Sequence, residues 1–324
     1  MDTTLVTSLR LNETANEIAD QMADQAELLR VRTERLASGA RVIDAGVQVD
    51  GGIGAGLALA RICMGGLGQV NCTPVPIGDQ SYPGLMVWTD HPAVSCMASQ
   101  YAGWSISVGN FFAMGSGPLR AHARVERELF EKLGYEEHAD EGVLVLESRS
   151  LPTDEVAGWV AEKARLDASR LTFVVAPTAS LAGGVQISAR IIETGLHKME
   201  TLGFDVRRVV SAIGTAPLPP VSKNDLRGIG RTNDCILYGG QARYTVRAGD
   251  AELQALAERV PASASRDYGI PFYEIFQRYE GDFYKIDPLL FSPAEVWLTS
   301  TETGRTFHAG RLNPEVLEAS LYPL

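Results

Sequence analysis

The residues most suggestive of chemistry are Arg190 and Glu193, a guanidinium and a carboxylate three positions apart in the segment 186–202. Apolar residues recur in this segment at helical spacing, so the sequence predicts a helix that carries both charged side chains on the edge opposite its apolar face. Such a pair is ordinarily a solvent-exposed ion pair worth roughly a few tenths of a kcal/mol. The alternative is catalytic, because a carboxylate held by a guanidinium can accept a proton from water if the helix edge faces a cleft.

Two details of the sequence favour the catalytic alternative. The preceding stretch APTASLAGGVQIS consists of small and apolar residues, unlike the approach to a solvated helix. An arginine placed before a glutamate is also the less favourable order for a helical ion pair. His197 falls on the same edge of the predicted helix, but no role is assigned to it.

A glycine-rich segment follows a predicted strand at 41–49 and contains Gly51, Gly52, Gly54 and Gly56. Strand, glycine turn and helix occur in the order of a dinucleotide-binding motif, but Leu57 stands where the third glycine belongs, and no Walker lysine follows. A tight turn bordering a pocket and an ordinary loop are the remaining interpretations. A nucleotide-dependent enzyme that uses this segment is kept as an alternative function.

A second loop, FAMGSGP at 112–118, leads to Arg120. Backbone N–H groups in such a loop can hold an anion or a carbonyl oxygen. The simpler interpretation is a strand-to-helix turn with Pro118 at the first helical position. Ser116 lacks the flanking pattern of a nucleophile elbow. The aromatic residues in 265–296 could form a wall for a flat heterocycle, or could belong to the core.

Composition restricts the class of partner. The 324 residues carry a formal net charge of −11, which argues against nucleic acid, since phosphate backbones require a basic surface. Four cysteines without CxxC spacing and five scattered histidines predict neither a disulfide framework nor a metal site, and favour a reducing cytosol. The first residues lack a signal-peptide pattern, and no apolar run of about 18 residues occurs, so we expect a soluble cytoplasmic protein without membrane contact.

Hydrophobic periodicity predicts a mixture of helices and strands separated by glycine-containing loops. Strands are expected at 41–49, 84–89, 104–108, 142–147 and 171–176, and helices at 11–37, 57–64, 154–164, 186–202, 251–260 and 272–278. The fold class is therefore α/β or mixed α+β. The length suggests two closely packed domains, 1–150 and 151–324, whose segments may interleave.

Several long stretches together resemble the methenyl-tetrahydromethanopterin cyclohydrolase family. They are ICMGGLG (62–68), TDHPAVSC (89–96), FAMGSGP (112–118), VAPTASLAGGVQISARIIET (175–194), KNDLRGIGRTND (223–234) and SRDYGIPFYEIF through DFYKIDPLLFSPAEV (265–296). They occur in the order found in the family and extend through nearly all of the chain. None of them is a general-purpose motif, so the resemblance is specific to this family.

The resemblance implies a family-specific fold of two α/β domains, with a pterin in the cleft between them and a homotrimeric assembly. It implies no metal or redox cofactor. Water would attack the cationic methenyl carbon of the pterin and give the formyl derivative. Arg190 and Glu193 match the catalytic pair of the family, with Glu193 as general base and Arg190 orienting it. Motif membership gives the candidate substrate-binding residues Tyr101, Gly115, Ser116, Arg120, Ser180, Gln186 and Asp267.

Tyr101 departs from the family pattern, in which archaeal members often carry a lysine near the substrate. A hydroxyl group can form a hydrogen bond but supplies no permanent charge. The substitution favours a pterin with a less anionic tail, as in bacteria that oxidise formaldehyde with a methanopterin-type carrier. A non-catalytic pterin carrier or scaffold is the second alternative function.

Overall fold

The computed structural model describes residues 9–281 and 285–322. The chain divides into two compact units: residues up to 68 together with 94–186, and 69–93 together with 187 onward. Each unit contains a six-stranded mixed sheet among the described residues, so the predicted α/β class is confirmed. Residue 150, the predicted domain boundary, lies within the first unit, and the division into domains at that residue stays a prediction.

The sheet of the first unit has the strand order β1-β2-β8-β7-β6-β5. Strands β2, β8 and β7 are parallel, and the outer pairs are antiparallel. The strands are β1 (Arg32–Arg35), β2 (Arg41–Asp44), β5 (Trp104–Val108), β6 (Phe111–Ser116), β7 (Gly142–Glu147) and β8 (Leu171–Ala176). The helices are α1 (Leu11–Asp24), α2 (Ala26–Leu29), α3 (Ile53–Cys63), α4 (Leu119–Ala123), α5 (Arg127–Leu133), α6 (Asp154–Ala164), α7 (Leu181–Ser188), the π-helix η2 (Ala93–Gln100) and the 3₁₀ helix η3 (Ala168–Arg170).

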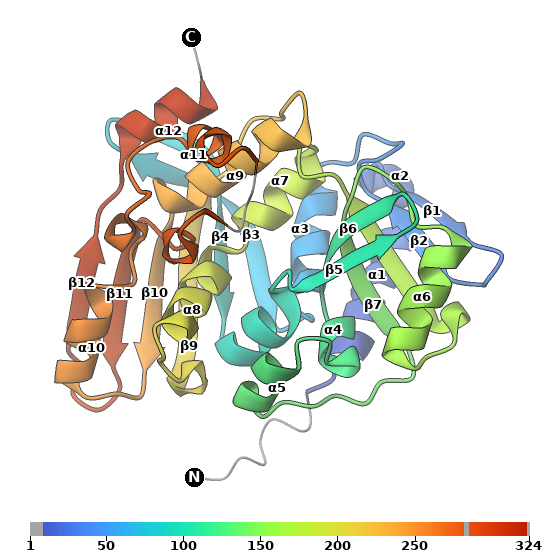
Figure 1. The fold of residues 1–324 in the computed structure, drawn as a ribbon, viewed down its shortest axis with the longest axis horizontal. Coiled ribbons are helices and arrows are strands. Elements are labelled where there is room, and N and C mark those ends of the chain that lie inside the picture. The colour runs from blue at the N-terminus through green and yellow to red at the C-terminus, as the bar shows by residue number, and fades with distance from the viewer. Residues whose placement is uncertain (1–8, 282–284, 323–324) are drawn as a thin grey trace. The chain divides into compact units, whose positions relative to one another are not determined.

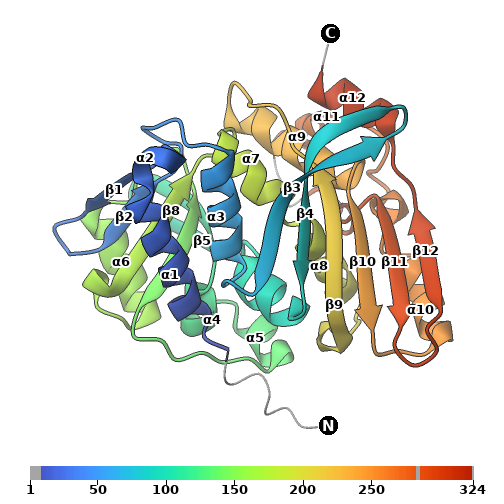
Figure 2. The same ribbon diagram turned by 180° about the vertical axis from the view of Figure 1, so that it is seen from behind.

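Alternation along β7 and β8 builds two cores on opposite faces of this sheet. Leu144 and Phe173 belong to the core formed with α6, whereas Val145 and Val174 belong to the core formed with α1 and α3. Both faces of the two strands are therefore buried, which is why their sequences are continuous apolar runs. Figure 1 shows α6 in front of this sheet, and Figure 2, seen from behind, shows α1 and α3 in front of it.

The sheet of the second unit has the order β12-β11-β10-β9-β4-β3. Its strands are β3 (Gly68–Ile77), β4 (Gln80–Thr89), β9 (Val209–Pro217), β10 (Gln241–Val246), β11 (Glu295–Ser300) and β12 (Thr306–Gly310). The helices are α8 (Ile191–Thr201), α9 (Asp225–Leu237), α10 (Asp250–Ala257), α11 (Phe272–Arg278), α12 (Pro314–Leu321) and the 3₁₀ helices η4 (Val206–Arg208), η5 (Ala262–Ala264) and η7 (Pro288–Leu290). Helix α8 packs on β9 and β10, and α10 on β11 and β12 (Figure 1). Helices α9, α11 and α12 pack around a common core that includes Phe272 of α11 and Leu317 of α12.

The predicted helix at 11–37 and the predicted strand at 41–49 end well before their expected ends. The helix predicted at 11–37 ends at Asp24, and after α2 the chain enters β1 through Arg30, whose φ is 58°. The strand predicted at 41–49 ends at Asp44, because the Asp44 carboxylate accepts hydrogen bonds from the N–H groups of Gly46, Val47 and Gln48 and fixes a turn there. No helix in the described ranges is long and apolar enough to cross a membrane.

Candidate active site

Arg190 and Glu193 lie at the start of α8, not in the middle of a longer helix. The single helix predicted over 186–202 is wrong, since α7 ends at Ser188 and α8 begins at Ile191, with Arg190 as its N-cap residue. The Arg190 N–H donates to the Ile187 carbonyl over 3.0 Å. Glu193 is the third residue of α8, in its first turn.

Both members of this pair are buried. Arg190 is 6% exposed and Glu193 is 5% exposed, so the interpretation as a solvent-exposed ion pair is wrong. Buried charges are tolerated where opposite charges and hydrogen bonds offset their desolvation, and these two lie within one helical turn of each other. The first turn of a helix also attracts negative charge, because its N–H groups point out of the helix end.

Neighbouring strands fix the position of this first turn. The Tyr244 hydroxyl of β10 donates to the Ile192 carbonyl over 3.0 Å. Ile191 packs closely against Gly214 and Gly240. A Cβ added to Gly214 would lie 2.9 Å from Ile191 Cγ2, and a Cβ added to Gly240 would lie 2.4 Å from Ile191 Cδ1. Larger residues at either glycine would displace α8 and the charged pair with it.

A buried lysine lies further along the same helix. Lys198 is 1% exposed, and its Nζ donates to the Leu289 carbonyl. Burial lowers the pKa of the Lys198 ammonium to about 8, against the opposing effect of the nearby Asp287 carboxylate. The contact ties α8 to η7 within the second unit.

In the first unit, two predicted residues join one polar chain. Ser116 Oγ lies 3.5 Å from Cys63 Sγ, which lies 3.8 Å from Gln186 Oε1. Gln186 Nε2 donates to Glu147 Oε1 over 2.9 Å. Ser116 and Gln186 are fully buried, whereas Glu147 is half-buried. The chain therefore ends on a carboxylate that reaches solvent-accessible space.

Sequence reasoning missed Glu147 and Cys63. Glu147 is the last residue of β7, which runs parallel to β8. Since ligands of sheets with parallel strands bind outside the carboxyl ends of those strands, the position of Glu147 at the end of an apolar run was the signal that could have identified it.

Arg120 is fully buried in α4, where it caps the π-helix η2. Its Nη1 donates to the carbonyl oxygens of Met97, Ala98 and Ser99, at 3.3, 3.4 and 3.1 Å. Its Nε donates to Glu126 Oε1 over 2.7 Å. A cation is favourable at the C-terminal end of a helix, where carbonyl groups lack helical partners.

Tyr101, which directly follows η2, packs against the same guanidinium. The Arg120 Cζ atom lies 5.1 Å from the centroid of the Tyr101 ring, within range of a cation–π interaction. A lysine at this position would bring a second positive charge close to Arg120. Arg120 thus fixes the end of η2, which Tyr101 directly follows. Direct contact of Arg120 or Tyr101 with substrate stays a prediction.

The other candidate residues are held in loops or at strand positions. Gly115 pairs with Trp104 and Leu146 in the sheet, and an added Cβ would lie 3.0 Å from the Trp104 carbonyl oxygen. Ser180 Oγ donates to the Pro177 carbonyl and accepts from the Gly183 N–H in the turn before α7.

Asp267 lies in the second unit, where it holds a loop together. It accepts from the Tyr279 hydroxyl over 3.0 Å and from the Asp287 N–H over 2.8 Å. Whether Asp267, Gly115 or Ser180 binds substrate stays a prediction.

The two glycine loops have structural explanations. Helix α3 begins at Ile53, so the loop interpretation is wrong for Gly54 and Gly56. A Cβ on Gly56 would lie 2.5 Å from Val185 Cβ, and the glycine permits close packing of α3 on α7. At the second loop, the strand-to-helix turn is confirmed, with Pro118 one position earlier than predicted, as the N-cap of α4. In the described part of the chain, no group of three or more His, Cys, Asp or Glu side chains is arranged to hold a metal ion.

Comparison with known proteins agrees with the motifs. Residues 10–321 match the sequence model of the family described as "Cyclohydrolase (MCH)". A methenyltetrahydromethanopterin cyclohydrolase of Methylobacillus flagellatus is 47% identical over 99% of this chain and 97% of its own. Proteins of the same name from Methylobacterium organophilum and Methanosarcina barkeri are 45% and 43% identical, over 96% and 95% of this chain and 97% of theirs. The resemblance seen in the motifs is thereby confirmed, and this chain belongs to the cyclohydrolase (MCH) family.

Proposed function

We propose that this protein is a methenyl-tetrahydromethanopterin cyclohydrolase that uses Arg190 and Glu193 as its catalytic pair. Family membership along 10–321 supports the reaction. The observation that carries the residue assignment is the burial of an arginine and a glutamate together at the start of α8, at its N-cap and in its first turn. A structural ion pair at this spacing would ordinarily be exposed.

In the proposed mechanism, Glu193 accepts a proton from water as the water oxygen bonds to the methenyl carbon. The hydroxyl group of the adduct then loses its remaining proton to solvent and becomes the formyl C=O, while the bond between that carbon and one ring nitrogen breaks. Glu193 returns the first proton to the departing nitrogen. Before the attack, the carboxylate also stabilises the cationic substrate. Arg190 orients the carboxylate toward the water, which lowers the entropic cost of the step.

We propose that the pterin is bound by the residues that the resemblance implicates. These residues are Tyr101, Gly115, Ser116, Arg120, Ser180, Gln186 and Asp267, together with the catalytic pair. The buried hydrogen bond between Gln186 and Glu147 supports the inclusion of Gln186, because it holds a carboxylate at the end of β7. A cytoplasmic homotrimer that serves formaldehyde oxidation completes the proposal. The family resemblance favours the trimer, and Tyr101 favours formaldehyde oxidation.

The test is to mix the purified, chelator-treated protein with methenyl-tetrahydromethanopterin and follow the near-ultraviolet absorbance of the substrate. Rapid loss of absorbance is the expected result. Binding without loss of absorbance would identify a pterin carrier and contradict the proposal. The family match along 10–321 disfavours the nucleotide-dependent alternative, as do the missing third glycine and the missing Walker lysine.

A further inference from the structure

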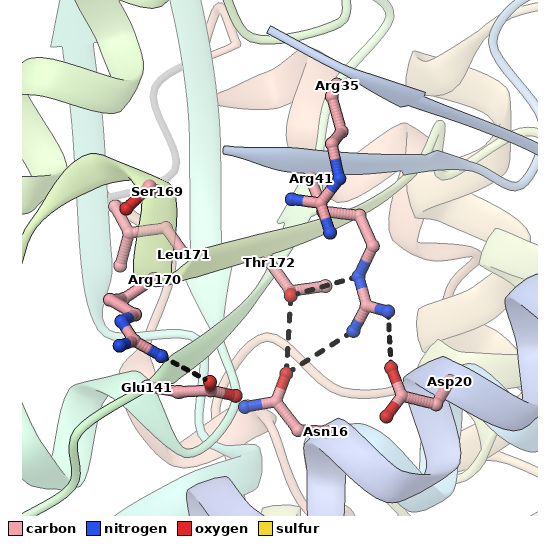
Figure 3. Close-up of a pocket in the computed structure, with 9 residues that line it drawn as sticks. All are labelled: Asn16, Asp20, Arg35, Arg41, Glu141, Ser169, Arg170, Leu171 and Thr172. Carbon is pink, nitrogen blue, oxygen red and sulfur yellow. Dashed lines mark hydrogen bonds and ion pairs between the residues drawn. The ribbon is translucent and has the colours of Figure 1, made fainter. Parts of the chain in front are cut away.

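A polar pocket of about 440 Å³ lies in the first unit, at the amino ends of β2 and β8 (Figure 3). Three arginines line it together with two carboxylates and several neutral side chains. The lining residues are Asn16, Asp20, Arg35, Arg41, Glu141, Ser169, Arg170, Leu171 and Thr172. The pocket therefore carries one excess positive charge, in a chain whose formal net charge is −11.

Two of the arginines oppose each other across a strand pair. Arg35 of β1 is directly opposite Arg41 of β2 in the antiparallel register. Like charges in such a pair destabilise a sheet, by up to about 1 kcal/mol. An anion between the two guanidinium groups would reverse that cost.

The hydrogen bonds around the pocket leave donors available. Arg41 is neutralised by Asp20 and also donates to Thr172 Oγ1, and Arg170 pairs with Glu141 over 3.1 Å. Arg35 donates to the Gly39 carbonyl over 2.9 Å, and no carboxylate in the described part of the chain pairs with it. Figure 3 shows Arg35, Arg41 and Asn16 around Thr172, with Arg170 on the other side.

Asn16 supplies a second, independent observation. The residue is 8% exposed, and its Oδ1 accepts from Thr172 Oγ1 over 3.2 Å. Its Nδ2 is buried and has no hydrogen-bond partner among the described residues. A buried donor without an acceptor is unfavourable, so the amide is suited to an acceptor that occupies the pocket.

We infer that this pocket binds an oxyanion of the phosphate class, free or as the terminal group of a small phosphorylated molecule. Guanidinium groups match the geometry of phosphate oxygens and donate two hydrogen bonds at once. The volume lies within the range of small-molecule sites, about 300–1,000 Å³. It therefore accommodates more than a bare anion.

The anion site is separate from the candidate active-site residues of the first unit. Leu171 begins β8 and Glu141 precedes β7, whereas Glu147 ends β7. A strand of six residues separates the two ends by roughly 17 Å. The inference therefore does not depend on the proposed function.

The test measures inorganic phosphate binding to the full chain by calorimetry and by thermal unfolding, with chloride used to match ionic strength. We expect saturable binding and a rise in Tm with phosphate that chloride does not reproduce. A parallel titration with glycerol 2-phosphate distinguishes a site for free phosphate from a site for the phosphate group of a small molecule. Tighter binding of the ester identifies a phosphorylated molecule, and equal or weaker binding identifies the free anion.

Two variants make the test specific. Arg35→Gln removes the arginine that no described carboxylate pairs with, and should weaken phosphate binding by about tenfold or more. Arg32→Gln is the matched control, since Arg32 is exposed on the same strand but points to the opposite face. Far-ultraviolet circular dichroism verifies that both variants fold. Absence of saturable phosphate binding by the parent, or equal affinity in Arg35→Gln and the parent, would overturn the inference.

Discussion

Gln186, on α7, donates a hydrogen bond to the carboxylate of Glu147, the last residue of β7, over 2.9 Å. The glutamine is fully buried, so the residues packed around it hold its side chain in place. The bond fixes the orientation of a carboxylate that lies half-exposed at the carboxyl end of a parallel strand. Gln186 is therefore a positioning residue for Glu147.

Replacing Gln186 with Leu should lower kcat/KM about tenfold or more. The leucine removes the donor, and a hydrogen bond to a charged group contributes about 1.5–3 kcal/mol. Loss of positioning should change KM as well as kcat, and steady-state kinetics at several substrate concentrations separates the two.

Gln241→Leu is the matched control for this variant. Gln241 Nε2 also donates to a glutamate, Glu295 Oε2, over 2.7 Å, but within the strand pair β10–β11 of the second unit. Its kinetics should match those of the parent. Equal losses in both variants would show that Gln186 acts only through general stability.

Gly56→Ala should destabilise the protein by about 1–3 kcal/mol. The new methyl group would lie 2.5 Å from Val185 Cβ and 3.1 Å from the Ala182 backbone, which forces α3 and α7 apart. Gly158→Ala is the matched control, because Gly158 also lies in a helix but has open space around its Cβ position. That control should gain up to about 1 kcal/mol from helix propensity. Denaturant unfolding measures both, and a stable Gly56→Ala variant would show that the close packing is unnecessary.

Ionisation of Asp234 should lower the free energy of unfolding as the pH rises from about 4 to about 7. Burial raises the pKa of the Asp234 carboxyl to about 7, while its hydrogen bonds with Ser320 and Phe272 oppose the shift. The unfolded chain ionises this group near pH 4, so in this window the folded state binds more protons and loses stability as protons leave. One such group contributes a slope of at most about 1.4 kcal/mol per pH unit.

Asp234→Asn should flatten that pH dependence. The asparagine keeps an oxygen to accept from the Phe272 N–H and cannot ionise. Glu137, whose pKa burial also raises to about 7, remains in the variant and gives a residual slope of the same sign. Denaturant unfolding at several pH values measures both proteins. Parallel stability curves for variant and parent would contradict the assignment to Asp234.

Many strands and helices could be predicted from the sequence, because apolar runs and capping residues are patterns of neighbouring residues. The runs GVLVLE and LTFVVA are buried on both faces, and strands were correctly predicted over 142–147 and 171–176. The helix over 154–164 was also predicted correctly, and Thr153 caps it by accepting from the Val156 N–H.

The remaining features depend on contacts between residues far apart in the chain. Residues 189–190 contain no proline or glycine that would predict the end of α7. The start of α8 is instead fixed by Tyr244 and by the glycines that accommodate Ile191. The partners Glu147 and Gln186 are 39 positions apart, and no spacing rule connects them. The candidate pair itself was found because three positions along a helix place two side chains on one edge.

The kcat of Glu193→Gln tests the central claim most directly. Glutamine keeps the size of the side chain but cannot accept a proton from water, so kcat should fall by about 100-fold or more. KM should rise as well, because the neutral amide no longer stabilises the cationic substrate. Glu200→Gln, the same change two helical turns along α8, should keep the parent kcat. A kcat of Glu193→Gln within a few-fold of the parent would contradict the assignment of Glu193 as the general base.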